Sequence, residues 1–206
     1  MSTLRLEVRD RIAFLTIDRP EALNALNAPT IQALHEHVVA LDERTDVRVV
    51  VLTGAGPKSF VAGADIAEFA GYSPAEGEAL ARRGHELLFN RIAQARKPYI
   101  AAINGFALGG GLELAMACHV RLASSTARMG LPEASLGVIP GYGGTQRLAQ
   151  LVGKGRALEL MFSASMIDAA KAESWGLVNA VHEPEQLLEA AEAMARQFIK
   201  ASGAAQ

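Results

Sequence analysis

The first part of the chain contains short runs in which apolar residues recur at regular intervals. Residues 4–8 alternate between apolar and polar side chains, which predicts a half-buried strand, and Ile12–Ile17 is expected to pair with it. Residues 47–52 are apolar except for Arg48, a pattern typical of a strand buried on both faces. The same reasoning predicts later strands at Tyr99–Ile103, 119–123 and 177–181.

Other segments carry apolar residues at helical spacing. Asn27 can cap a helix over residues 29–42, whose apolar residues fall on one face. Three glycines at 109–111 open an apolar helix that ends near Cys118, and a short helical turn is expected from Asp65. The remaining predicted helices are 74–95, 143–151, 155–162, 169–175 and 184–200.

Strands and helices therefore alternate along the chain. This order predicts an α/β fold with a largely parallel sheet, because parallel strands need crossover connections. The 206 residues suit one domain, which we place at 1–206. Half of the residues are hydrophobic, so the domain can bury a sizeable core.

Composition narrows the classes of function. The formal net charge is -2, so bulk electrostatics give no reason to expect nucleic acid or a membrane surface as a partner. Cys118 is the only cysteine, which excludes a disulfide within the chain and disfavours a cysteine-based metal site. No run approaches the roughly 18 apolar residues that span a bilayer, and the first residues do not resemble a signal peptide. We therefore expect a cytoplasmic location.

Two glycine-rich segments, residues 60–66 and 104–114, each follow an apolar strand and enter a helix. Backbone N–H groups at a helix start lack intrahelical partners and lie at the positive end of the helix dipole. Two such segments facing each other would form an oxyanion hole, in which N–H groups bind a negatively charged oxygen. A tight turn also explains three glycines before a helix. Neither segment has the spacing of a nucleotide-binding loop.

Two glutamates are candidates for acid–base chemistry. Glu113 lies near the start of an otherwise apolar helix, where a buried carboxylate is rare. Glu133 follows Pro132 and precedes the glycine-containing stretch 136–141. Alternatively, each is an ordinary glutamate that stabilises the start of its own helix. Together, the two carboxylates suit general acid–base catalysis on one substrate.

The other candidate residues are weaker. His35 and His37 are two positions apart on a predicted helix, so they do not share a face. Cys118 and His119 are interpreted as core and strand start rather than as nucleophile and base. The serines at 124–125 lack the glycine flanks of a nucleophile elbow. No metal site is expected.

Five segments around these residues form a specific set of motifs. They are 19–26 (RPEALNAL), 62–66 (AGADI), 105–111 (GFALGGG), 131–133 (LPE) and 139–148 (IPGYGGTQRL). In order and spacing they resemble the enoyl-CoA hydratase/isomerase family, or crotonase superfamily, over essentially the whole chain. The resemblance implies a spiral of β-β-α units with two roughly perpendicular sheets surrounded by helices.

The resemblance also implies roles for individual residues. The backbone N–H groups of Ala64 and Gly110 would hold the thioester oxygen, and Glu113 and Glu133 match the two catalytic glutamates of hydratases. The residues implied to contact the coenzyme A or acyl part of the substrate are Ala22, Leu23, Ala62, Ala64, Asp65, Ile66 and Gly110. Some hydratases have lysines near the CoA phosphates at the positions of Glu21 and Ala67, so these cationic contacts are absent here.

The reaction implied by the resemblance is hydration. A hydro-lyase of fatty acid metabolism would add water across the 2,3 double bond of a 2-enoyl-CoA thioester. Coenzyme A is part of that substrate, so no separate cofactor is expected. A double-bond isomerase, which needs one glutamate, and a non-catalytic relative that binds RNA stay open as alternatives. The resemblance further implies a homotrimer or a dimer of trimers, and a core domain without the usual C-terminal helical segment.

Overall fold

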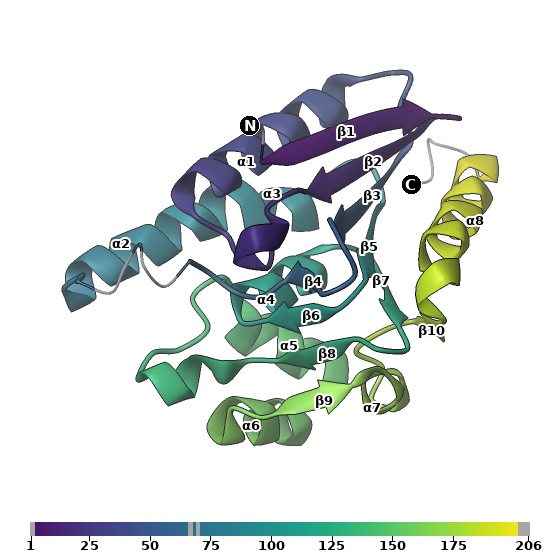
Figure 1. The fold of residues 1–206 in the computed structure, drawn as a ribbon. Helices are drawn as coiled ribbons and strands as arrows, with labels where there is room; N and C mark the ends of the chain where they lie inside the picture. The colour runs from purple at the N-terminus through teal and green to yellow at the C-terminus, as the bar shows by residue number, and fades with distance from the viewer. Residues whose placement is uncertain (1–2, 66–67, 69–70, 202–206) are drawn as a thin grey trace.

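The computed structural model describes residues 3–65, 68 and 71–201. Within these residues six strands form the larger sheet (Figure 1): β1 (Leu4–Arg9), β2 (Ile12–Ile17), β3 (Val49–Gly54), β5 (Tyr99–Ile103), β7 (Val120–Ser124) and β10 (Ala180–His182). Their order in the sheet is β1-β2-β3-β5-β7-β10. β1 and β2 pair antiparallel, and every later neighbour pairs in parallel.

A smaller sheet is formed by short strands, two of which lead into the glycine-rich segments. In the described part of the chain it has four strands: β4 (Ser59–Val61), β6 (Phe106–Leu108), β8 (Arg128–Gly130) and β9 (Met166–Asp168). The pairs β4–β6 and β6–β8 are parallel, and β8–β9 is antiparallel. Because β4 and β6 run in the same direction, the glycine-rich segments that leave them start at the same edge of this sheet.

Helices surround the two sheets (Figure 1). They are α1 (Ala28–Glu43), α2 (Pro74–Gly84), α3 (Asn90–Ala93), α4 (Gly110–Ala117), α5 (Gly144–Val152), α6 (Lys154–Ser163), α7 (Ala169–Ser174) and α8 (Leu187–Lys200), with 3-10 turns η1 (Pro20–Ala22), η4 (Pro132–Leu136) and η5 (Pro184–Gln186). No helix among the described residues is long and apolar enough to cross a membrane.

Side-chain alternation divides the larger sheet between two apolar layers. On one face, Val50 and Leu52 belong to the main core, together with the buried residues of α1 and α4. On the other face, Val49 and Val51 belong to a second cluster that the buried side of α8 closes. β3 is therefore covered on both faces, which explains its almost uninterrupted apolar sequence.

The predicted α/β class with a largely parallel sheet is confirmed. The boundaries of the last strand were wrong, because it occupies Ala180–His182 instead of 177–181. The predicted helix 74–95 is not a uniform α-helix, because a π-helical turn, η3 (His85–Phe89), lies between α2 and α3. The helical turn expected from Asp65 falls largely outside the described residues.

The family resemblance implied a second sheet, but the apolar pattern did not locate its strands, which lie in segments that we expected to be loops or left unassigned. Each of its strands has three residues. Such short strands show too few positions for apolar alternation to be recognised. Their pairing depends instead on partners far away in the chain.

Candidate active site

Two asparagines hold the loop that leads from β3 to β4 and onward to Ala64. Asn24 is fully buried and donates from Nδ2 to the carbonyl oxygen of Ser59 (2.9 Å). From the start of the next glycine-rich segment, Asn104 donates from Nδ2 to the carbonyl oxygen of Gly56 (2.7 Å). Because side-chain amides satisfy these backbone carbonyls, the loop keeps one path without regular secondary structure.

Ala64 and Gly110 approach each other beyond the ends of β4 and β6. Ala64 forms a parallel bridge with Leu26, which uses the N–H of Asp65 and the carbonyl of Gly63. Since N–H groups alternate in direction along an extended chain, the N–H of Ala64 points to the opposite side. A Cβ built on Gly110 would lie 3.7 Å from the Ala64 nitrogen.

Glycines allow α4 to begin at this point. Gly110 is its first residue, so the N–H of Gly110 has no partner within the helix. Gly109 has φ +49° and ψ −125°, a conformation that residues with a Cβ rarely adopt. A Cβ on Gly111 would collide with the carbonyl oxygen of Val61, so α4 packs directly on β4. The backbones of Ala64 and Gly110, whose N–H groups are predicted to form an oxyanion hole, therefore lie close together in space. The oxyanion hole itself stays a prediction.

Glu113 lies in the first turn of α4, and its side chain is enclosed by the protein: the residue is 1% exposed. Its Oε1 accepts hydrogen bonds from the backbone N–H groups of Tyr142 (2.8 Å) and Gly144 (2.7 Å). Burial raises the pKa of Glu113 to about 7, and the carboxyl of Glu133 adds to this, whereas the two N–H groups and Arg147 oppose it. The carboxyl therefore changes protonation near neutral pH, as suits a general acid or base.

Glu133 approaches the start of α4 from η4. A Cβ built on Gly109 would lie 2.8 Å from Oε1 of Glu133. The Oε2 atom is buried and has no hydrogen-bond partner among the residues that the structure describes. Burial raises the pKa of this carboxyl as well. A buried oxygen without a protein partner can bind a water molecule or a ligand group.

Six of the seven predicted substrate-binding residues, all except Gly110, come from two segments that lie side by side. The Leu23 carbonyl accepts a hydrogen bond from the N–H of Ala62 (3.1 Å), and Ala22 ends η1 just before it. The carboxylate of Asp65 forms an ion pair (3.3 Å) with the arginine that precedes η1. Leu23 is 40% exposed, so its side chain is accessible to a ligand. Ile66 lies outside the described residues, and the substrate contacts of all seven stay predictions.

Sequence reasoning missed the residues that hold Glu113. The sequence points to Tyr142 and Gly144 only as members of the motif 139–148. A Cβ built on Gly144 would lie 2.9 Å from Cγ and Oε1 of Glu113, so glycine at this position makes room for the carboxyl. The ring of Tyr142 stacks on Phe89 of η3, with 4.4 Å between ring centroids. The repeated glycines of residues 141–144 were the available signal for a backbone that approaches another group closely.

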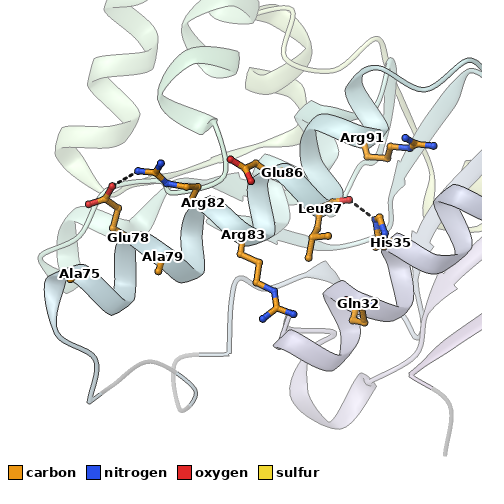
Figure 2. A pocket seen from close by; sticks show the side chains of 10 residues that line it. All are labelled: Gln32, His35, Ala75, Glu78, Ala79, Arg82, Arg83, Glu86, Leu87 and Arg91. Atoms are coloured by element: carbon orange, nitrogen blue, oxygen red, sulfur yellow. Dashed lines mark hydrogen bonds and ion pairs between the residues drawn. The ribbon is translucent and has the colours of Figure 1, made fainter.

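An open groove of about 750 Å³ lies between α1 and the helical run of α2 and η3, as Figure 2 shows. Half of its ten lining residues are charged. Among them Arg82 pairs with Glu78 (2.6 Å), and Nδ1 of His35 lies 2.7 Å from the carbonyl oxygen of Leu87. None of the four predicted catalytic residues lines this groove. A different side of the same helical run, which includes Phe89, packs against Tyr142 near Glu113. The groove is therefore not the candidate active site.

Known proteins resemble this chain in both sequence and structure. The sequence profile of the family "Enoyl-CoA hydratase/isomerase" matches residues 7–206. The short-chain-enoyl-CoA hydratase of Clostridium acetobutylicum is 47% identical over 199 residues, covering 97% of this chain and 76% of that protein. The crotonyl-CoA hydratase of Syntrophomonas wolfei is 48% identical over 183 residues, covering 89% and 70%. The crystal structure of the enoyl-CoA hydratase from Bacillus anthracis has a TM-score of 0.91 and 36% identity, over 98% of this chain and 78% of that one. This chain therefore belongs to the enoyl-CoA hydratase/isomerase family.

Proposed function

We propose that this chain is an enoyl-CoA hydratase, a hydro-lyase of fatty acid metabolism that adds water across the 2,3 double bond of a 2-enoyl-CoA thioester. One observation carries the proposal: Glu113 lies in the first turn of α4, and Glu133 approaches the start of this helix from η4, where the backbones of Ala64 and Gly110 meet. Relatives named as hydratases of short-chain enoyl-CoA and of crotonyl-CoA support it.

In the proposed reaction, the N–H groups of Ala64 and Gly110 donate hydrogen bonds to the thioester oxygen. This withdraws electrons from the conjugated double bond and makes C3 electrophilic. Glu113, as a carboxylate, takes a proton from a water molecule held between the two glutamates while the water oxygen bonds to C3. The π electrons move toward the thioester, and the resulting enolate oxygen is stabilised by the two N–H groups.

Glu133, in its protonated form, then gives its proton to C2 as the enolate returns to the thioester. The substrate has gained a hydroxyl group at C3 and a hydrogen at C2. Transfer of the proton from Glu113 to Glu133 through water restores both groups for the next turnover. Burial raises the pKa of each carboxyl, which suits a pair that exchanges one proton near neutral pH.

A direct assay separates this proposal from isomerisation. The chain is incubated with crotonyl-CoA, with longer 2-enoyl-CoA thioesters and with a 3-enoyl-CoA, and both hydration and double-bond movement are measured. We expect hydration to dominate, because an isomerase needs one carboxyl and this site has two. Isomerisation without hydration would refute the proposal. RNA retained in a filter-binding test, with neither reaction detected, would instead favour a non-catalytic role.

We also propose that the chain assembles as a homotrimer or a dimer of trimers. Large apolar side chains lie exposed on the loop after η4 and on α6, including Ile139 (75% exposed) and Phe162 (78% exposed). Exposed apolar patches often mark interaction surfaces. Light scattering should give three or six times the mass of one chain, and a monomer at micromolar concentration would contradict the proposal. A cytoplasmic location stays a prediction.

A further inference from the structure

A second layer of hydrogen bonds lies behind the N–H groups that hold Glu113. Arg147 on α5 donates from Nη1 to the carbonyl oxygen of Tyr142 (2.7 Å) and from Nη2 to Oδ1 of Asn90 (3.0 Å). Asn90 is the first residue of α3, so the guanidinium connects α5 and the segment before it to the helical run of α2, η3 and α3. A planar guanidinium holds two acceptors in one fixed geometry.

The π-helical turn η3 shapes the surface on which this guanidinium lies. π turns are rare and occur frequently at functional sites. Phe89, at the end of η3, stacks on the ring of Tyr142. A Cβ built on Gly143 would collide with the guanidinium of Arg147 and would lie 2.8 Å from Cε1 of His85. Side chains from η3 and α5 therefore contact the backbone of residues 142–143 closely.

Peptide geometry connects Arg147 with Glu113. One N–H on the carboxyl comes from Tyr142 and the other from Gly144. The Tyr142 carbonyl belongs to the peptide group between the two that carry these N–H groups. Because each peptide group is planar, holding this carbonyl restricts the backbone rotations that orient both donors.

We infer that Arg147 is a positioning residue for Glu113: it holds the Tyr142 carbonyl so that two neighbouring backbone N–H groups keep the carboxyl in one orientation. This inference rests on the proposed function, in which Glu113 takes the proton from water. Arg147 itself needs no contact with the substrate.

The positive charge of Arg147 and the two backbone hydrogen bonds both favour the ionised form of Glu113. The titratable groups that interact with Glu113 are Glu133 from η4, Arg147 from α5 and Tyr142 from the segment before α5. His85 of η3 lies beside residue 143. The positive charge of Arg147 opposes the rise in the pKa of Glu113 that burial causes. Without this charge the protonated form of Glu113 becomes more favourable, and protonated Glu113 cannot take a proton from water. The acid limb of the pH–rate profile should therefore move to higher pH.

The first test is the kinetics of Arg147→Gln. We expect kcat to fall by about tenfold, less than the roughly 10² expected for losing the base itself, with little change in KM. Arg147→Lys keeps a positive charge but cannot hold both acceptors in the same plane, so kcat should fall while the acid limb moves less. Asn90→Ala removes one anchor of the guanidinium and should lower kcat more weakly.

The matched control is Arg196→Gln on α8. Arg196 also makes two side-chain contacts, with Asp10 (2.6 Å) and Glu192 (2.6 Å), but on the opposite side of the larger sheet. Its kinetics should equal those of the wild type. In the Glu113→Gln background, adding Arg147→Gln should lower kcat only slightly further. The effects of two residues on kcat do not add when one of them acts through the other. An equal loss from Arg147→Gln in both backgrounds would overturn the inference.

A second readout does not depend on hydration. Carbon NMR of protein labelled at the glutamate carboxyls gives the titration of Glu113, assigned through its loss in Glu113→Gln. A titration moved to higher pH in Arg147→Gln supports the inference even if no enoyl-CoA is hydrated, in which case only the proposed function fails. An unmoved titration in folded Arg147→Gln overturns it. If Arg147→Gln does not fold, wild-type kcat in both Arg147→Lys and Asn90→Ala overturns it, and a reduced kcat with unchanged KM in both supports it.

Discussion

Glu113 and Glu133 present carboxyl groups to one site, yet their surroundings differ. Oε1 of Glu113 accepts two backbone hydrogen bonds, whereas Oε2 of Glu133 is buried without a partner in the described part of the chain. Hydrogen bonds to a carboxylate favour its ionised form, and burial without them favours the protonated form. Burial nevertheless raises the pKa of Glu113 to about 7 and also raises that of Glu133. The proposed roles, a fixed base at Glu113 and a proton donor at Glu133, therefore rest on these hydrogen bonds and not on a difference in pKa.

The two carboxyls also depend on different glycines. Gly144, at the start of α5, leaves room for the side chain of Glu113, and Gly109, before α4, leaves room for that of Glu133. Gly109 has a positive φ, but Gly144 does not. Each carboxyl can thus be disturbed separately, without changing the glutamate itself.

The largest effect is expected from Gly110→Pro. In the proposed reaction this variant destabilises the enolate, which forms when Glu113 takes its proton and disappears when Glu133 gives its own. Proline removes the N–H that we assign to the oxyanion hole and restricts the backbone. Losing one such donor typically costs about 10² to 10³ in rate. Circular dichroism must accompany the assay, since the variant can also misfold. A folded and fully active Gly110→Pro protein would exclude the donor role.

Glu113→Gln and Glu133→Gln should each lower kcat by at least about 10², the lower scale for losing a positioned acid or base. Binding of a CoA ester should survive, because the amide keeps the shape of the side chain. The residual pH profiles sharpen the comparison: Glu113→Gln should lose the acid limb and Glu133→Gln the alkaline limb. Exchange of the two limbs would reverse the roles, and a near wild-type rate in either variant would refute the two-carboxylate mechanism.

Crowding each carboxyl should have a smaller effect. An added Cβ in Gly144→Ala would lie 2.9 Å from Glu113, and in Gly109→Ala 2.8 Å from Glu133. We expect each to lower kcat by roughly tenfold, because small displacements of catalytic groups cost up to about 10². Gly109→Ala should also destabilise the fold, since its φ is +49°. The control is Gly155→Ala on α6, where a Cβ meets nothing within 4 Å. Equal kcat in all three variants would show that neither carboxyl is confined.

Sequence reasoning predicted the larger sheet because its strands have five or six residues, apart from the short β10, and are largely apolar. It singled out Glu113 because a carboxylate on an apolar helix needs an explanation. The short strands of the smaller sheet were missed, because three residues show no recognisable period.

The surroundings of the glutamates could not be predicted in the same way. The bond from the Tyr142 N–H to Glu113 joins residues 29 positions apart, and that from Arg147 to Asn90 joins residues 57 positions apart. No local pattern encodes such contacts, because they exist only once α4, α5 and the helical run around η3 have packed. The motif resemblance pointed to the candidate catalytic positions, and its motif 139–148 contains Tyr142, Gly144 and Arg147 without indicating that they hold Glu113.

The last prediction concerns stability, and it tests the protonation that the comparison assumes. In the folded chain the pKa of Glu113 is about 7, above its ordinary value of 4.5. The folded state therefore binds this proton more tightly than the unfolded chain does. The resulting stabilisation is fully present below pH 4.5 and is lost as the pH rises to about 7.

Glu113→Gln removes this dependence of the unfolding free energy on pH, while its amide oxygen can still accept both backbone hydrogen bonds. In urea unfolding, the unfolding free energy of Glu113→Gln minus that of the wild type should rise across this window, by on the order of 1 kcal/mol per pKa unit. Glu133→Gln should show the same direction with a smaller change, because Glu133 is less buried. Parallel pH–stability curves for the wild type and Glu113→Gln would mean that Glu113 has the same pKa in the folded and the unfolded chain. The two N–H groups and Arg147 would then offset burial completely, and burial would not tune the pKa toward neutrality.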